Sequence, residues 1–257
     1  MRLSQTDLDV LQRTILAVHE PRDTNAFRAA VPGICRELVD ADHTRLIEAD
    51  FDSVSGRLES RGHWESRPML DDALMARSGR LLGTHPFCRH LSGTGDLPTL
   101  RLSDFMSLRQ LRDTALYREF YVPTQTERVL GTAWRAGNCV ITATAMRGAG
   151  SRDFGERDRL MLDLLVPHLR QAHCRAARTA ACRESELREL EACGLTSREA
   201  EVACWMAKGK TNSEIATILR TSVRTAEKHV ERVLGKLGVD NRTAAAMRIV
   251  CRGSERD

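Results

Sequence analysis

Three signals for the start of a helix follow one another in the last quarter of the chain, and they constrain its fold more than any other feature. Thr196-Ser-Arg-Glu199 and Thr211-Asn-Ser-Glu214 each have the spacing of a capping box, in which hydroxyl and carboxylate accept each other's backbone N–H. Ser222 is a third N-cap, and Asn241 can cap one further helix. Gly209 suits the left-handed position that ends a helix. This segment is therefore predicted to be a bundle of four short helices.

The third of these helices, expected over residues 222–237, has two different faces. Its apolar residues recur every three or four positions and are predicted to pack on the other helices: Val223, Ala226, Val230, Val233 and Leu237. Its basic residues recur every four positions along the outer side: Arg220, Arg224, Lys228, Arg232 and Lys236. A short helix, a tight turn at residues 220–221 and a longer helix with a basic side are the layout of a helix-turn-helix, which places its second helix in the DNA major groove.

The positive charge of the chain is confined to this segment. From Gly194 to the end there are 12 basic and 8 acidic residues, an excess equal to the net charge of +4 of all 257 residues. A polyanion would be attracted to this segment and not to the first two thirds of the chain. A small helical bundle with merely solvated charges is the alternative, and the three caps, the sharp turn and the charge together favour DNA binding.

The segment from Leu195 to about Ala246 resembles, without a gap, the DNA-binding domain of the LuxR/NarL family of bacterial regulators. The residues that carry the resemblance are Leu195-Thr196, Arg198-Glu199, Gly209, Asn212, Glu214-Ile215-Ala216, Ser222, Thr225, His229, Lys236-Leu237 and Arg242. The resemblance implies a four-helix domain whose third helix reads double-stranded DNA and whose fourth often supports dimer contacts. It also implies a transcription regulator that acts as a homodimer, with RNA polymerase as a further candidate partner.

The same resemblance predicts which residues contact DNA. Glu227, Lys228 and Glu231 fall at positions that meet base edges, and Lys210, Thr225 and Arg242 fall near phosphates. The predicted set is completed by Asn212, Ser222, Val223, Arg224 and Arg232. The two glutamates leave two interpretations open: each can accept a hydrogen bond from cytosine N4, or each only offsets basic neighbours on the helix surface.

The first 190 residues predict an α+β domain with an antiparallel sheet. Helices are expected over residues 4–19, 25–39 with an interruption at Pro32-Gly33, about 109–120, and 153–190 with a cap at Asp153 and a kink at Pro167. Strands are expected over residues 43–51 and 57–64 around a turn at 52–56, and in a hairpin of 128–134 and 139–146 around 135–138.

Four short motifs in this part resemble the sensor half of many LuxR-type regulators, which is similar to GAF domains: residues 84–88, 102–106, 114–121 and 153–158. The resemblance covers roughly residues 20–175 and implies a pocket for a small-molecule effector of unknown identity. Trp64, Tyr117, Tyr121 and Trp134 are the candidate lining residues, unless they pack an ordinary core. The predicted domains are a sensor at 1–170, a helical linker at 171–193 and the DNA-binding domain at 194–257.

Several other classes are disfavoured. A receiver domain would begin with a strand and paired acidic residues, and an acyl-homoserine-lactone sensor would show a Trp-x-x-x-Tyr element. The Asp153-Phe-Gly155 motif opens a helix and lacks the loops of a kinase. The cluster at residues 85–90 and the eight scattered cysteines are weak metal or disulfide signals. We expect no cofactor, no metal, no membrane span, a cytoplasmic location and no catalysis. The remaining alternatives are a constitutive regulator whose first domain only dimerises, and an enzyme fused to a DNA-binding module.

The helix expected after residue 156 carries a heptad-like stripe of Leu162, Leu165, Leu169, Ala172 and Ala176. One hypothesis is that this stripe pairs two protomers and passes the ligand state to the DNA-binding domains. The alternative is that the stripe packs within its own chain.

Overall fold

The computed structural model describes residues 2–52, 57–69, 73–74, 81, 85–94, 97–137 and 139–254. The predicted turns at residues 52–56 and 135–138 and the motif at 84–88 lie partly outside the described residues. Two compact units make up the chain, Met1–Ala177 and Arg178–Asp257, and each is described by itself.

The first unit is built on one five-stranded sheet whose described pairings are all antiparallel, in the order β2-β1-β5-β4-β3. Its strands are β1 (His43–Asp52), β2 (Arg57–Glu65), β3 (Leu97–Arg101), β4 (Arg128–Ala136) and β5 (Cys139–Arg147). The two predicted hairpins are confirmed, with β5 as the central strand. The edge strand β3 was not predicted, because five residues inside a turn-rich stretch carry too little alternation to be recognised.

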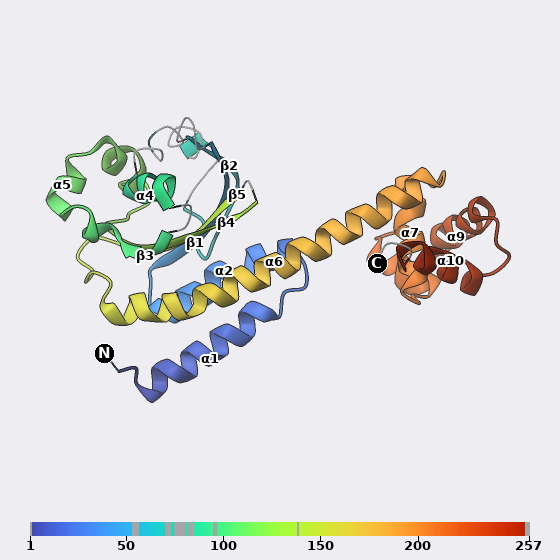
Figure 1. Ribbon diagram of the computed structural model, residues 1–257, viewed down its shortest axis with the longest axis horizontal. Coiled ribbons are helices and arrows are strands. Elements are labelled where there is room, and N and C mark those ends of the chain that lie inside the picture. Colours follow the sequence, from blue (N-terminus) through green and yellow to red (C-terminus); the bar gives the residue numbers. More distant parts are fainter. Residues whose placement is uncertain are drawn as a thin grey trace. The chain divides into compact units, whose positions relative to one another are not determined.

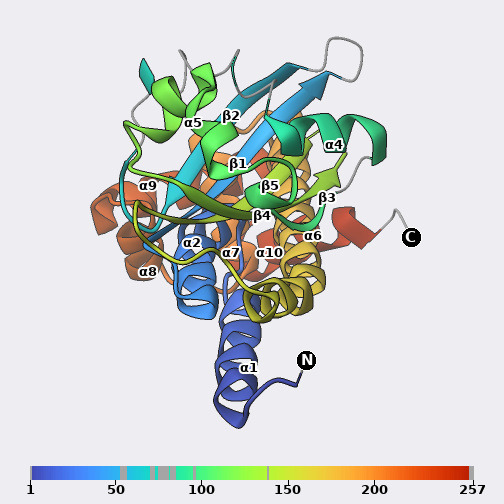
Figure 2. The ribbon, with the colours of Figure 1, turned by 90° about the vertical axis from the view of Figure 1, so that its left-hand side faces the viewer.

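Helices cover both faces of this sheet (Figure 1). On one face lie α2 (Thr24–Val39) and the first part of α6 (Glu156–Ala192), and α1 (Gln5–His19) packs against α2. On the other lie α4 (Pro86–Thr94), α5 (Leu108–Arg112) and a π-helical turn, Tyr117–Tyr121 (Figure 2). Each face has its own apolar core. The α+β class is therefore confirmed.

Three local predictions in this unit are corrected. Pro32 does not interrupt α2, because its buried ring packs in the core and offsets the lost backbone hydrogen bond. The single helix expected at residues 109–120 is instead α5 and the separate π-helical turn. Asp153 is not the cap of α6: it accepts the Phe154 N–H, and the Asp158 carboxylate accepts the Gly155 N–H at 3.0 Å.

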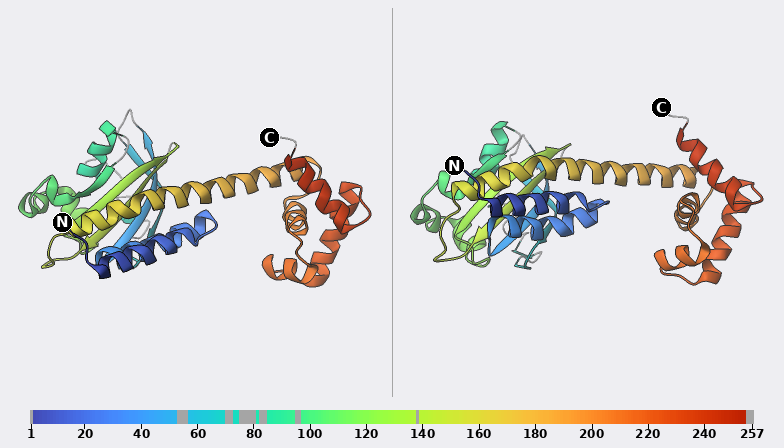
Figure 3. Two further views of the ribbon diagram at one scale, coloured as in Figure 1. Left: turned by 60° about the horizontal axis from the view of Figure 1, so that its bottom comes forward. Right: turned by 90° about the horizontal axis from the view of Figure 1, so that it is seen from below.

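The stripe on α6 packs within its own chain. The burial of this stripe is nearly complete, at no more than 2% exposed for each of Leu162, Leu165, Leu169, Ala172 and Ala176, and all five belong to the core that also contains residues of α1, α2 and the sheet. The first part of α6 lies beside α1 and α2 (Figure 3). The hypothesis that this stripe pairs two protomers is wrong, since these side chains are already covered. The helix also continues through Pro167 without a break.

One arginine whose role the sequence did not predict contacts both the end of α2 and the start of α6. Arg147, at the end of β5, donates to the carbonyl oxygens of Val39 at 2.9 Å and Asp40 at 3.1 Å. Its guanidinium lies 4.1 Å from the centre of the buried Phe154 ring and 3.4 Å from the Asp158 carboxylate. Through Arg147, the Asp153-Phe-Gly155 motif is therefore connected to the end of α2.

The second unit contains four short helices after the end of α6: α7 (Ser197–Ala207), α8 (Asn212–Ile218), α9 (Val223–Leu237) and α10 (Arg242–Ser254). The capping boxes at Thr196 and Thr211 and the cap at Ser222 are confirmed, and Asn241 accepts the Ala244 N–H at 2.8 Å. Helix α9 packs on α7 and α8 around an apolar core. In the described parts of both units, no helix is long and apolar enough to cross a membrane.

Candidate nucleic-acid interface

The turn between α8 and α9 sets the position of α9. Arg220 has a φ of +51°, and the Thr221 N–H donates to the Ala216 carbonyl at 2.9 Å. Ser222 then accepts the Thr225 N–H at 3.1 Å, which satisfies one of the free donors at the start of α9. Only Arg220 and Thr221 lie between the C-cap of α8, Leu219, and the N-cap of α9, Ser222, so the turn between the two helices is short.

One side of α9 is buried as predicted, with one exception. Ala226, Val230, Val233 and Leu237 are at most 9% exposed. Val223 was predicted to belong to the same stripe, but its side chain is 44% exposed. As the first residue of α9, it lies at the turn and beyond the reach of the core. Val223 is thus accessible together with the polar residues of this helix end.

The outer side of α9 presents five exposed charges, from Arg224, Glu227, Lys228, Glu231 and Arg232. None of them forms an ion pair with a residue in the part of the chain that the structure describes. No ion pair among the described residues therefore supports the interpretation that Glu227 and Glu231 only offset their basic neighbours. These side chains remain available to a partner molecule.

Lys236 differs from the other basic residues of the helix. Its Nζ lies 2.6 Å from the carboxylate of Glu199 on α7, whose side chain is only 4% exposed. This ammonium and the Thr196 N–H together lower the pKa of Glu199 to about 2. Of the five basic residues predicted along the outer side of α9, Lys236 is therefore engaged within the protein, where it links α9 to α7.

Three residues predicted near phosphates or in the DNA-contact set come together at the start of α8. Arg242 donates to the Asn212 side-chain oxygen at 3.0 Å and to the backbone carbonyl of Lys210. Lys210 also pairs with Glu214 at 2.9 Å, a contact that both partners make while well exposed. These bonds join the start of α10 to the start of α8. The Thr211 N–H and Lys210 lower the pKa of Glu214 to about 2.

The four aromatic residues predicted to line a pocket do not come together. Trp64 and Trp134 pack in the core between the sheet and α2 and α6. Tyr117 and Tyr121 belong to the core on the opposite face. The reason is strand parity: Trp134 points to the same face as Leu130, and the register places Trp64 beside Leu46 on that face. The prediction of one aromatic pocket is therefore corrected.

Sequence reasoning missed a group of buried polar residues near Tyr121. The His85 ring Nε2 lies 2.6 Å from the Tyr121 hydroxyl, and Arg45 on β1 pairs with Glu65 on β2 at 2.6 Å. Burial lowers the pKa of His85 to about 4 and raises the pKa of Tyr121 above its ordinary value. His85 belongs to the cluster considered for metal binding, and the described residues contain no group of three or more metal-binding side chains. No signal in the sequence would have joined Arg45 to this group.

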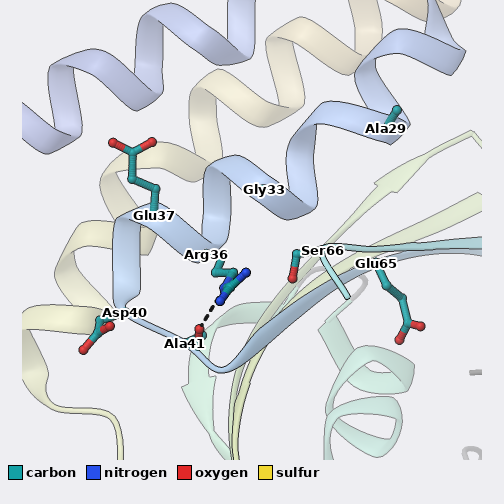
Figure 4. A pocket seen from close by; sticks show the side chains of 8 residues that line it. All are labelled: Ala29, Gly33, Arg36, Glu37, Asp40, Ala41, Glu65 and Ser66. Carbon is teal, nitrogen blue, oxygen red and sulfur yellow. Dashed lines mark hydrogen bonds between the residues drawn. The ribbon is translucent and has the colours of Figure 1, made fainter. Parts of the chain in front are cut away.

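A separate groove of about 500 Å³ lies between α2 and the end of β2 (Figure 4). It is lined by Ala29, Gly33, Arg36, Glu37, Asp40, Ala41, Glu65 and Ser66. Arg36 extends into it and donates to the Ala41 carbonyl at 3.3 Å, whereas the Glu65 carboxylate is directed away from it. None of the predicted aromatic residues lines this groove.

The helical segment of the second unit matches a known family. Residues 194–249 match the model of the bacterial regulatory proteins of the luxR family. The transcriptional activator SolR of Ralstonia solanacearum is 48% identical over 59 residues, which are 23% of this chain and 25% of SolR. The transcriptional repressor ThaA of Burkholderia thailandensis is 48% identical over 50 residues, which are 20% of this chain and 21% of ThaA. The chain thus spans about a quarter of the length of these relatives.

Solved structures match over more of the chain and with low identity. Escherichia coli SdiA is 17% identical, with a TM-score of 0.47, over 96% of this chain and 98% of SdiA. The acylhomoserine-lactone-dependent factor CepR2 of Burkholderia cenocepacia is 12% identical, with a TM-score of 0.47, over 69% of this chain and 99% of CepR2. The family match, the three N-caps and the two-residue turn agree on the second unit, and residues 194–249 are therefore a helix-turn-helix domain of the luxR family of bacterial regulatory proteins.

Proposed function

We propose that the chain is a DNA-binding transcriptional regulator and that α9 is its recognition helix. The observation that carries this proposal is the set of five exposed charges on the outer side of α9, which lack ion pairs with described residues. A helix whose side chains are already paired must break those pairs to bind DNA, whereas these side chains need only lose their hydration.

Within this proposal Lys228, between Glu227 and Glu231, donates to a base edge in the major groove, and each glutamate can accept from cytosine N4. The DNA phosphates are contacted by Arg224, Thr225 and the group of Lys210, Asn212 and Arg242. The edge of the interface is formed by Ser222, Val223 and Arg232. Because the base-reading positions carry mixed charge, phosphate contacts supply most of the affinity and a few residues supply the sequence preference.

A binding-site selection from random duplexes with the full chain tests the role of Lys228. Loss of a base contact costs about 1–3 kcal/mol, so Lys228→Ala is expected to bind the selected site roughly 5- to 150-fold more weakly and to relax the preference at one base pair. Lys210→Ala is the matched comparison, because loss of a phosphate contact weakens all sequences alike. An unchanged motif bound by Lys228→Ala at full affinity would contradict the base-contact role.

We further propose that a small molecule bound by the first unit modulates DNA binding. The support is the partial exposure of three residues in the middle of the sheet. Ile47 on β1 and Thr142 and Thr144 on the central strand β5 are only half-buried. An ordinary filled core would bury such central positions. Native mass spectrometry of the purified chain tests this: a mass above that of the polypeptide supports the sensor, and a bare mass with unaltered DNA affinity in cell extract favours a constitutive regulator.

The proposed regulator binds DNA as a homodimer. The stripe on α6 is covered, so the contact is assigned to α10, where Met247 is 58% exposed. Sedimentation velocity tests this assignment: Met247→Glu should dissociate the dimer, and Leu16→Glu, at a 61% exposed position on α1, is the matched control. A dimer that persists in Met247→Glu would place the contact elsewhere.

A further inference from the structure

The groove of about 500 Å³ between α2 and the end of β2 has a volume within the range of small-molecule sites (Figure 4). Helix α2 covers the face of the sheet opposite to α4 and α5 (Figure 2). None of the three half-buried residues in the middle of the sheet lines this groove. It is therefore distinct from the place suggested above for the effector.

Gly33 lies on the α2 wall of the groove, although neither its backbone conformation nor its packing requires a glycine. It is an interior residue of α2, where glycine is a poor helix former, and its φ is not positive. A Cβ added at Gly33 would meet no atom of the described residues within 4 Å. The effect of the missing side chain is to leave the groove open one turn before Arg36.

Two side chains that face each other in the groove keep hydrogen-bond donors without a partner among the described residues (Figure 4). Arg36 donates through Nε to the Ala41 carbonyl at 3.3 Å, and its two terminal nitrogens make no bond with the described part of the chain. The Ser66 hydroxyl accepts the Thr44 N–H at 2.9 Å, and its own proton has no acceptor in the described ranges. The Ser66 backbone N–H also donates to the Thr44 carbonyl at 3.0 Å, so β1 holds this hydroxyl in place. An oxygen acceptor between Arg36 and Ser66 would satisfy both donors.

The charges around the groove favour a ligand with a single negative charge. The carboxylates of Glu37 and Glu65 each pair with an arginine, at 2.9 Å and 2.6 Å. Figure 4 shows the Asp40 carboxylate turned away from Arg36, as is that of Glu65. The positive charge of Arg36 is thus left for one carboxylate, whose planar shape matches a guanidinium. A second negative charge on the ligand would have no such partner and would be repelled by the carboxylates at the rim.

We propose that this groove binds a small monocarboxylate whose carboxylate lies between Arg36 and Ser66. Arg36 supplies the opposite charge, the Ser66 hydroxyl donates one hydrogen bond, and the apolar part of the ligand lies along Ala29 and Gly33. The inference goes beyond the proposed function, because it assigns to the first unit a second binding site with its own chemical class of ligand.

Three probes of similar shape test the class of ligand on the full chain: phenylacetate carries one negative charge, phenylacetamide none and phenyl phosphate up to two near pH 7. The readout is the ¹³C-methyl signals of labelled alanine, because Ala29 and Ala41 line the groove and Ala17 on α1 does not. Phenylacetate is expected to shift the Ala29 and Ala41 signals saturably and to leave that of Ala17 in place. It should bind about fivefold more tightly than phenylacetamide, the upper end of what an exposed ion pair contributes, and more tightly than phenyl phosphate.

Two variants locate the site. Arg36→Met removes the charge and should abolish the preference for phenylacetate over phenylacetamide, whereas Arg61→Met, at an exposed arginine of β2, should keep it. Gly33→Leu places a side chain in the open space and should abolish the shifts with every probe. Ala26→Leu, which adds the same side chain at an exposed position of α2 outside the groove, is the control and should keep them.

Equal affinities of phenylacetate and phenylacetamide, or tighter binding of phenyl phosphate, would overturn the proposal. So would unmoved signals of Ala29 and Ala41, a phenylacetate preference that survives in Arg36→Met, or shifts that persist in Gly33→Leu. The comparison of the probes on the wild-type chain needs no variant, so it decides even where a variant does not fold. No readout involves DNA, so failure here leaves the proposed regulator standing, and loss of DNA binding leaves this inference untouched.

Discussion

The ion pair between Lys236 and Glu199 gives a quantitative test of how α9 is held. In Lys236→Met the Glu199 carboxylate loses a charge-assisted hydrogen bond of 2.6 Å while its side chain stays 4% exposed. Such bonds contribute about 1.5–3 kcal/mol, and the lower end applies because Lys236 is 39% exposed. A loss of about 1.5 kcal/mol in a unit of this size lowers its melting temperature by roughly 6–12 °C.

The same pair predicts a pH dependence with a definite sign. The folded-state pKa of Glu199, about 2, lies below its ordinary value of 4.5. The pair therefore stabilises the fold fully above about pH 4.5, and this stabilisation is lost as the pH falls toward 2. Without Lys236 the pKa moves back toward 4.5, so the stability difference between wild type and Lys236→Met should shrink over this range.

The assay follows unfolding of the second unit within the full chain. Of the three tryptophans, only Trp205 lies in residues 178–257, so the ¹⁹F signal of 5-fluorotryptophan at this position reports on that unit. Lys228→Met is the matched control, because Lys228 lies on the same helix and has no ion pair with described residues. Equal melting temperatures of Lys236→Met and wild type at pH 7, or a difference that grows toward pH 3, would refute this account of Lys236.

Three further outcomes are expected. Gly131→Ala should destabilise the first unit by about 1–3 kcal/mol in urea titrations, since its Cβ would clash with Phe87, whereas Gly33→Ala, which meets nothing within 4 Å, should cost no stability. Arg147→Met should lower the stability of the same unit by about 2–4 kcal/mol, measured by the ¹⁹F signal of 5-fluorotryptophan at position 134, because four backbone carbonyls lose their donor; a loss under about 0.5 kcal/mol would show that water replaces it. Ser222→Ala should cost about 1 kcal/mol through the lost N-cap, seen as faster amide exchange at the start of α9, and unchanged exchange would contradict the cap.

The second unit could be predicted nearly completely because its signals are local. A capping box spans four residues, so Thr196 and Thr211 mark the starts of their helices without knowledge of the rest of the fold. The wrong predictions for this unit concern single side chains. Val223 was predicted to pack in the core and is exposed, and Lys236 was predicted to face outward and pairs with Glu199. Lys236 pairs with Glu199 because α7 lies close to α9, and this distance between helices cannot be predicted from the residue spacing within α9.

The first unit was predicted in outline, and its site was not. The hairpins followed from alternation, but the face to which each aromatic residue points depends on register. Trp64 lies one residue from Glu65, and this single step separates a core side chain from the polar group around Arg45. The irregularity in the pairing of β1 with β2 after Glu48 adds a shift that the sequence does not mark. Arg147 was missed because its partners are backbone carbonyls, which any residue carries.

The two cores on opposite faces of the sheet have a consequence for how such a protein can change. Substitutions around Phe87 and Tyr121 alter the core under α4 and α5, while the side chains that hold α6 lie on the other face of the sheet. Because distant sites without shared partners affect stability almost additively, the core under α4 and α5 can change its side chains without loosening the packing of α6. For protein engineering, this makes the face under α4 and α5 the part of the first unit in which substitutions disturb α6 least.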